Sequence, residues 1–288
     1  MKIVTLLFAL GIAGVHTAQA DDMIQWYVGN FPPATIPSGP EQGKGWGDQR
    51  IQLVMKRVST FQYEITQSST TRMMEDMKTK PNVCNPNLLK TPEREAFIEF
   101  SQPFSLIIPN GIVTTRTRYD KFKPYLTKNG ELRLDDLLAH GQHRIGLINN
   151  RSYGAGIDAV IKKYAGTKTV VDIPSLNYPV SRLLKLAHHE DYDLVPGHAP
   201  ELRYLARESG LNESDFIFLT VAEESALVPT YIGCSKSDIG KKFIAAINKF
   251  AADEQVQKED TGAYRSWLDD KTASNYDALR KKRNTANK

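Results

Sequence analysis

The chain has 288 residues, of which 41% are hydrophobic and 24% are charged, and its formal net charge at pH 7 is +4. This composition excludes an intrinsically disordered chain, and the length is sufficient for one large domain or for two lobes. No internal repeat or low-complexity segment is evident.

The N-terminus has the pattern of a secretory signal peptide. Lys2 precedes an apolar run over residues 3–15, and residues 18–20 (AQA) form a cleavage motif. The apolar run is too short to span a membrane, and no later segment approaches the required length. We therefore expect a signal peptide over residues 1–20 and an exported mature protein that is not membrane-embedded and has no nucleic-acid partner. The basic tail over residues 280–283 is expected to be a solvated end.

Cys84 and Cys234 are the only cysteines of the chain. In an oxidising compartment such a pair is commonly bridged, so we predict a disulfide. Two separate buried thiols are the alternative.

The first part of the chain alternates between strand and helix patterns. The expected elements are a strand over Met23–Val28, a helix capped by Asp48, a strand over residues 63–66, a helix marked by Met73, Met74 and Met77, and a strand that ends at Val83 and Cys84. Such alternation implies a parallel sheet.

Residues 106–115 form an extended stretch that Pro109, Asn110 and Gly111 interrupt, which is typical of a chain crossing between two bodies. The alternation then begins again. We expect strands over residues 144–149, 168–173, 192–195 and 216–221, helices opened by Asp135 and Ser152, and helices around residues 180–187 and 202–206. Periodicity is lost over residues 222–230, after which a strand over residues 231–234, a long helix over residues 239–250 and a short helix over residues 264–268 are expected. Two crossings at one hinge suit a clamshell around a small ligand.

A short segment of the first part has the residues of an anion site. It contains turns at Pro86 and Pro92 and the polar residues Lys90, Thr91 and Arg94. An Arg on a Pro-bounded loop suits anion binding, because the guanidinium makes paired hydrogen bonds to a carboxylate or phosphate. The alternative is a surface ion pair of Arg94 with Glu93 or Glu95.

The pattern T-x-x-R over residues 91–94, followed by F-S-x-P-F over residues 100–104, resembles bacterial extracellular solute-binding proteins of family 3. The resemblance covers residues 24–268 and implies an α/β, two-lobed periplasmic-binding-protein-like clamshell, in which each lobe is a sheet flanked by helices. Lobe 1 would comprise residues 21–107 and 228–288, and lobe 2 residues 108–227. The resemblance also implies that Arg94 holds a ligand carboxylate. It places the returning strand in lobe 1, which brings both cysteines into that lobe.

Residues 149–154 lie between a strand and a helix, where free amides of the first turn bind anions readily. Arg151, Ser152 and Tyr153 are therefore candidate ligand-binding residues. The alternative is that Ser152 only caps its own helix. The resemblance implies that Ser152 gives its hydroxyl and amide to the carboxylate, opposite Arg94.

Three further positions come from the resemblance. Phe31 falls where the family has an aromatic wall, although it could equally cover the core as a loop aromatic. Thr70 falls near the second wall and is not aromatic. His198 stands where the family has an Asp that holds the ligand's ammonium group, so an anion without an amine is a candidate ligand. If His198 touches the ligand, affinity is expected to change between about pH 5 and 8.

These residues predict a periplasmic solute-binding protein that captures a small carboxylate-bearing ligand, an amino acid or another organic anion, for a membrane transporter or a sensor. It is expected to be a monomer, to need no cofactor, metal or catalytic residue, and not to be an enzyme. The alternative implied by the resemblance is a dehydratase for cyclic carboxylates. Its acid would have to come from one of four carboxyl groups, those of Glu93, Glu95, Glu223 and Glu224.

Overall fold

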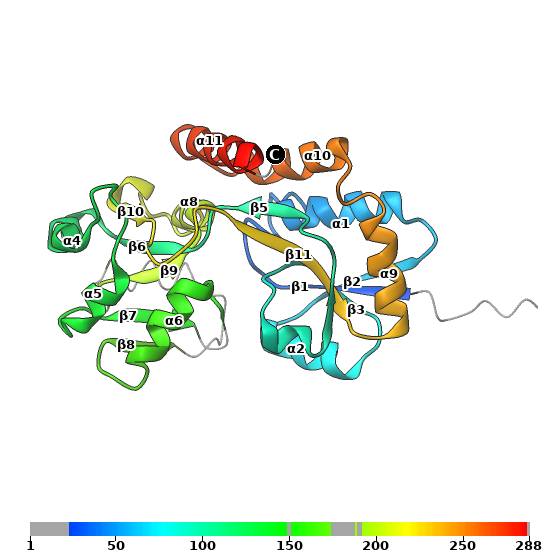
Figure 1. Ribbon diagram of the computed structural model, residues 1–288, viewed down its shortest axis with the longest axis horizontal. Coiled ribbons are helices and arrows are strands. Elements are labelled where there is room, and N and C mark those ends of the chain that lie inside the picture. The colour runs from blue at the N-terminus through cyan, green and yellow to red at the C-terminus, as the bar shows by residue number, and fades with distance from the viewer. Residues whose placement is uncertain (1–22, 149–150, 174–187, 189–191, 287–288) are drawn as a thin grey trace, which may run out of the picture.

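The structure is a computed structural model that describes residues 23–148, 151–173, 188 and 192–286. Two groups of strands, each with its own helices, lie beside each other and are joined by two crossing segments (Figure 1). The protein therefore has the α/β, two-lobed architecture that the sequence predicts.

The first lobe contains a six-stranded sheet in the order β2-β1-β3-β11-β4, with β5 paired to β11. Its strands are β1 (Met23–Val28), β2 (Gln62–Gln67), β3 (Val83–Leu88), β4 (Ile98–Phe100), β5 (Ser105–Ile107) and β11 (Val228–Ser235). β1 pairs with β2 and β3 in parallel, and β11 runs antiparallel to β3, β4 and β5. The expected parallel sheet and the returning strand are both present.

Helices cover both faces of this sheet. The helices are α1 (Trp46–Arg57), α2 (Thr70–Thr79), the short α3 (Pro92–Glu95) and α9 (Asp238–Asn248). Val54 of α1 and Phe243 of α9 belong to one buried cluster, and Met73 and Met77 of α2 belong to another. Hence α1 and α9 pack on one face, and α2 packs on the other.

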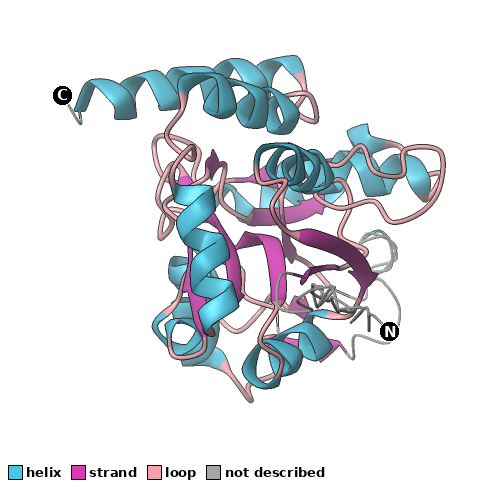
Figure 2. Cartoon of the chain, turned by 90° about the vertical axis from the view of Figure 1, so that its right-hand side faces the viewer, coloured by secondary structure: helices cyan, strands magenta, loops and turns pink. Residues whose placement is uncertain are grey.

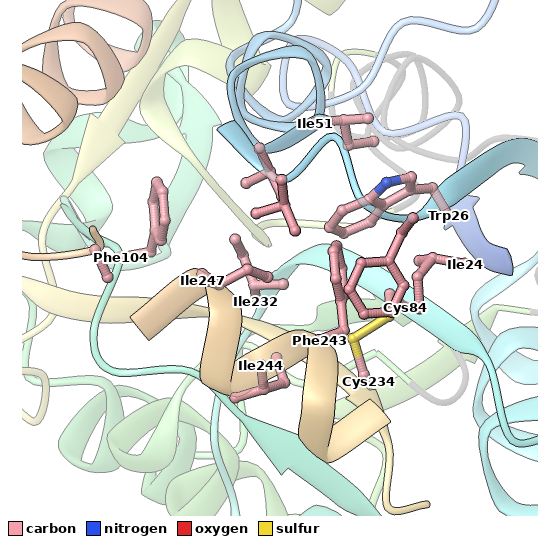
Figure 3. Close-up of a cluster of buried hydrophobic side chains, with 14 of the residues drawn as sticks. Ile24, Trp26, Ile51, Cys84, Phe104, Ile232, Cys234, Phe243, Ile244 and Ile247 are labelled. Carbon is pink, nitrogen blue, oxygen red and sulfur yellow. A yellow bond between two sulfur atoms is a disulfide. The ribbon is translucent and has the colours of Figure 1, made fainter. Parts of the chain in front are cut away.

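The predicted disulfide is present. Cys84 of β3 and Cys234 of β11 face each other in the antiparallel ladder and are bonded. Both are buried beside Trp26 and Phe243 (Figure 3). The bond therefore links the outgoing and returning parts of the chain inside the core of the first lobe.

The second lobe has two smaller sheets. β6 (Gly111–Thr115), β9 (Val195–Gly197) and β10 (Phe216–Leu219) form an antiparallel sheet in the order β10-β6-β9, and β7 (Ile145–Ile148) pairs in parallel with β8 (Val170–Ile173). A bridge between Ile145 and Leu194 joins the two sheets. The helices are η2 (Arg116–Arg118), α4 (Tyr119–Phe122), η3 (Lys123–Tyr125), α5 (Leu134–Ala139), α6 (Ala155–Tyr164), α8 (Ala199–Glu208) and η4 (Glu213–Asp215).

The chain crosses to the second lobe between β5 and β6 and returns between β10 and β11. At the crossing, β5 and β11 form an antiparallel ladder that pairs Ile107 with Val228. A division of the chain at 107/108 and 227/228 stays a prediction.

The C-terminal segment differs from expectation. Helices α10 (Glu254–Arg265) and α11 (Asp270–Ala286) replace the short helix and solvated tail that the sequence suggested. They form a separate layer above the sheets (Figure 2). The hydroxyl of Tyr276 donates to Leu106 O (2.6 Å), and that of Tyr264 accepts from Ile108 N (3.2 Å), so both helices are fastened to the crossing segment. The sequence pattern missed α11 because the helix is largely polar and buries few residues.

Three local expectations are also wrong. Asp48 is not the N-cap of α1, because Gly45 occupies that position and the Asp48 carboxylate accepts from Gly45 N and Ile36 N. Val83 and Cys84 begin β3 rather than end it, and Pro86, which was expected in a turn, lies within this strand. Pro92 opens α3, since a Pro at the first helical position loses no hydrogen bond.

Some expectations lie outside the described residues, namely the signal peptide and the helix over residues 180–187. Within the described ranges, no helix is long and apolar enough to cross a membrane.

Candidate binding site

A cleft of about 870 Å³ lies between the two lobes. Its first-lobe wall comes from the loop after β1, the start of α2, the end of β3, and Arg94. Its second-lobe wall comes from the crossing segment and the ends of β7 and β9. The lining residues are Gly29, Asn30, Phe31, Ala34, Thr35, Gln67, Ser68, Ser69, Thr70, Thr71, Met73, Met74, Asn85, Asn87, Leu88, Leu89, Arg94, Asn110, Ile148, Arg151, Ser152 and His198. Strand ends of open α/β sheets are the usual place for ligands.

Arg94 is the principal positive charge of the first-lobe wall. It is half-buried on α3, and one guanidinium nitrogen donates to Leu89 O at 2.8 Å. Burial lowers the pKa of Arg94, while Asp158 and Glu93 oppose that shift from a distance. No carboxylate among the described residues forms an ion pair with it, so the surface pair with Glu93 or Glu95 is absent. The guanidinium of Arg94 remains positively charged despite its partial burial, so it can bind an anion.

Arg151 faces Arg94 from the second lobe but is already paired. Its guanidinium makes two hydrogen bonds to Glu201, at 2.9 and 2.8 Å, and the Glu201 side chain is 1% exposed. The same guanidinium lies over the ring of Phe31, 4.6 Å from its centroid. A bidentate pair of this kind fixes the position of Arg151 and largely neutralises its charge.

His198 lies at the second-lobe wall as the N-cap of α8, and its backbone N–H donates to Glu201 (3.1 Å). Burial lowers the pKa of His198 to about 4. The Glu201 carboxylate opposes this shift, Arg151 adds to it, and a hydrogen bond to the Ile108 backbone opposes it. The expected titration between pH 5 and 8 is therefore wrong, because the buried ring stays neutral over that range. The ring makes an edge contact with Phe31.

The start of α6 differs from the sequence interpretation. Gly154, with φ of 113°, is the N-cap, and Ser152 lies before the helix. The Ser152 hydroxyl donates to Asp158 (2.5 Å), and the backbone N–H of Tyr153 donates to the same carboxylate (2.8 Å). The Ile157 N–H donates to Glu224 (2.8 Å). Several donors that were expected to meet a ligand are thus occupied by carboxylates of the protein itself.

The structure brings six of the nine predicted site residues to one cleft: Phe31, Thr70, Arg94, Arg151, Ser152 and His198. The other three lie outside it. Lys90 pairs with Glu95 at 2.7 Å, Thr91 caps α3, and the buried Tyr153 hydroxyl accepts from Ile148 N.

Sequence reasoning placed Thr70 at the site but missed the neighbouring hydroxyl groups of Ser68, Ser69 and Thr71, which also line the cleft. Ser69 is the N-cap of this helix, and its hydroxyl accepts from Arg72 N. The run Ser68-Ser69-Thr70-Thr71 before an amphipathic helix is a recognisable capping signal, and it could have placed this helix end beside the site.

The comparisons with known proteins identify the fold. The sequence matches no family model and no curated protein. Among solved structures, the periplasmic VFT2 domain of Bordetella pertussis BvgS is 18% identical, with a TM-score of 0.60 over 86% of this chain and 94% of that one. A histidine kinase sensor domain with similarity to periplasmic binding proteins is 14% identical, with a TM-score of 0.64 over 85% and 96%. The arginine-bound substrate-binding protein AbpA of Streptococcus pneumoniae is 13% identical, with a TM-score of 0.61 over 86% and 97%.

The fold is that of a type 2 periplasmic binding protein. Within this fold, the four carboxyl groups considered for an enzyme lie away from the cleft lining. Glu93 and Glu95 are exposed on α3. Glu223 accepts from the first backbone N–H groups of α5, and Glu224 does so for α6, where burial raises its pKa. None of the four supplies an acid to the cleft. No group of three or more potential metal ligands occurs in the described part of the chain.

Proposed function

We propose that this protein is a periplasmic solute-binding protein that captures a small carboxylate-bearing ligand between its two lobes. The observation that carries the proposal is Arg94, a half-buried guanidinium that lines an interlobe cleft and has no carboxylate partner among the described residues. A planar, charged donor pair of this kind suits a ligand carboxylate. The remaining lining supplies hydroxyl groups from α2 and apolar side chains.

Closure of the clamshell follows from the position of the polar groups. Arg94 belongs to the first lobe and Ser152 to the second, so a bound anion reaches both walls only when the lobes approach each other. Ser152 donates its hydroxyl to Asp158, and its oxygen remains available as an acceptor. The first-lobe guanidinium therefore provides the main electrostatic attraction, and the second lobe supplies a polar cover.

Export and delivery complete the proposal. The signal peptide over residues 1–20 would direct the chain to the periplasm, where a monomer hands its ligand to a membrane transporter or a sensor. The solved structures of this fold include both kinds of protein, which supports either destination. N-terminal sequencing of periplasmic material is expected to begin at Asp21, and a sequence that begins at Met1 would contradict cleavage after Ala20.

Native mass spectrometry of gently purified protein identifies a carried ligand, and calorimetry then measures its affinity. Arg94→Ala is expected to weaken binding by about 2–5 kcal/mol, as for loss of one partner of a buried charge pair. Arg94→Lys is expected to recover only part of this, because the forked donor pair is lost. The control is Arg133→Ala, which removes the partly exposed N-cap Arg of α5 that pairs with Asp136. Equal affinities of wild type and Arg94→Ala would exclude the proposed carboxylate site.

A further inference from the structure

The cleft has positive charge but no negative charge with which to hold a ligand amine. Among its described lining residues, the charged side chains are Arg94 and Arg151, and no Asp or Glu is present. The buried carboxylate of Glu201 on this side gives both oxygens to Arg151. A buried ammonium without a carboxylate is strongly unfavourable.

Several neutral acceptors of the cleft already accept hydrogen bonds from the protein itself. An ammonium group presents three donors and needs several acceptors at once. Asn85 Oδ1 accepts from Asn87 N at 2.9 Å, Asn110 Oδ1 accepts from Arg151 at 3.4 Å, and Gly29 O accepts from the Thr35 hydroxyl at 2.6 Å. These groups do not form the converging set of oxygens that an ammonium would require.

His198 provides one acceptor of a different kind. The residue is 8% exposed and lines the cleft, and its Nδ1 has no hydrogen-bond partner among the described residues. The Ile108 backbone accepts a hydrogen bond from the ring, and in the tautomer with this proton on Nε2 the unpartnered Nδ1 is an acceptor. A neutral imidazole can accept from a hydroxyl group. It carries no negative charge, so it cannot neutralise an ammonium.

We propose that the ligand of this cleft is an organic acid without an ammonium group, whose carboxylate meets Arg94 and whose hydroxyl group donates to His198 Nδ1. This inference rests on the proposed function and specifies its ligand class. The apolar body of the acid would lie against Met73, Leu88 and Ile148, which line the same cleft. His198 is thereby the residue that selects the substituent beside the carboxylate.

The test compares pairs of acids that differ only in this substituent. The pairs are leucine with leucic acid, phenylalanine with phenyllactic acid, and alanine with lactic acid, each titrated into the mature protein by calorimetry at neutral pH. In any pair that binds, the hydroxy acid is expected to bind about 30-fold or more tightly, the lower end of the effect of an unpaired buried charge. An amino acid that binds as tightly as its hydroxy partner would overturn the inference and leave the proposed function in place.

Two variants of one position make the test independent of ligand size. His198→Asp adds a carboxylate and is expected to shift the preference towards the amino acid by about tenfold or more. His198→Asn is neutral and similar in size to Asp, and it is expected to keep the preference for the hydroxy acid. Circular dichroism checks that both variants are folded. If Asp and Asn give the same preference, His198 does not select the substituent.

The ligand found by native mass spectrometry provides a separate outcome. A carried organic acid without an amine supports the inference, whereas a carried amino acid overturns it. If no carried molecule is found and no acid of either series binds, the proposed function fails, and the ligand class fails with it.

Discussion

The buried ion pair between Arg50 and Asp260 allows a quantitative test of what holds the C-terminal helices to the first lobe. The Arg50 guanidinium donates to both Asp260 oxygens, at 2.6 and 2.9 Å, and the two side chains are 0% and 1% exposed. Removing one partner of such a pair destabilises a protein by about 3–5 kcal/mol, because an uncompensated charge stays buried. In Asp260→Asn, Arg50 keeps Pro86 O (2.8 Å) and Asn87 Oδ1 (2.5 Å) as acceptors. We therefore expect a loss near the lower limit, about 3 kcal/mol.

The measurement is urea unfolding of the oxidised protein, followed by tryptophan fluorescence and circular dichroism. With a slope of about 2–3 kcal/mol per molar urea, the midpoint is expected to fall by about 1–1.5 M. Asp277→Asn is the matched control, since it breaks an Asp–Arg pair with Arg265 whose side chains are 49% and 47% exposed. This change should reduce the unfolding free energy by less than about 1 kcal/mol. Equal losses in the two variants would refute the argument that burial sets the effect.

Three further predictions concern stability. His198 has a pKa of about 4 in the folded protein, compared with its ordinary value of 6.5. The unfolded chain therefore binds a proton at this residue more readily than the folded protein does. As the pH falls from 6.5 to 4, the free energy of unfolding decreases. In urea unfolding at each pH, wild type should therefore lose up to about 3 kcal/mol relative to His198→Asn across that interval, and parallel pH curves would contradict it. Reduction of the Cys84–Cys234 bond, which closes a loop with a sequence separation of 150, should lower the unfolding free energy by about 5 kcal/mol in the chain-entropy model, and an unchanged urea midpoint in dithiothreitol would exclude this. Tyr276→Phe should cost about 1–2 kcal/mol in thermal unfolding, because Leu106 O loses its donor, and a melting temperature equal to that of wild type would show that water replaces it.

Sequence periodicity predicted the elements whose apolar side chains enter a core. Val54 of α1, Met77 of α2 and Phe243 of α9 are all buried, and their spacing indicated these helices. The helix α11 buries few residues, and it meets the crossing segment through the Tyr276 hydroxyl and a few apolar side chains. So short an apolar contact leaves little periodic signal in the largely polar sequence of this helix. Short-range patterns therefore found the cores but not the layer that joins them.

Some residues of the candidate site could likewise be predicted from the sequence, and others could not. Arg94 falls in a segment with a recognisable pattern, whereas Phe31 and His198 were placed near the same cleft only by the family resemblance. The partner of Arg151 could not be predicted from the sequence. Glu201 lies 50 residues away and has the pattern of an ordinary acidic residue in the first turn of a helix. The neutral state of His198 likewise depends on burial that only the folded chain reveals.

The layer formed by α10 and α11 determines where the two lobes can rotate. The hydroxyl groups of Tyr264 and Tyr276 are hydrogen-bonded to the crossing segment, and β5 is paired with β11 up to Ile107. The crossing segment therefore cannot bend at β5 without breaking hydrogen bonds. Rotation of the second lobe must therefore be absorbed by backbone outside this ladder. Gly111 opens β6, whose ladders with β9 and β10 belong to the second lobe. A Cβ at this glycine would come within 2.3 Å of Leu219 O, where the outgoing and returning chains touch. A side chain at position 111 would therefore force β6 away from its neighbour β10 inside the second lobe.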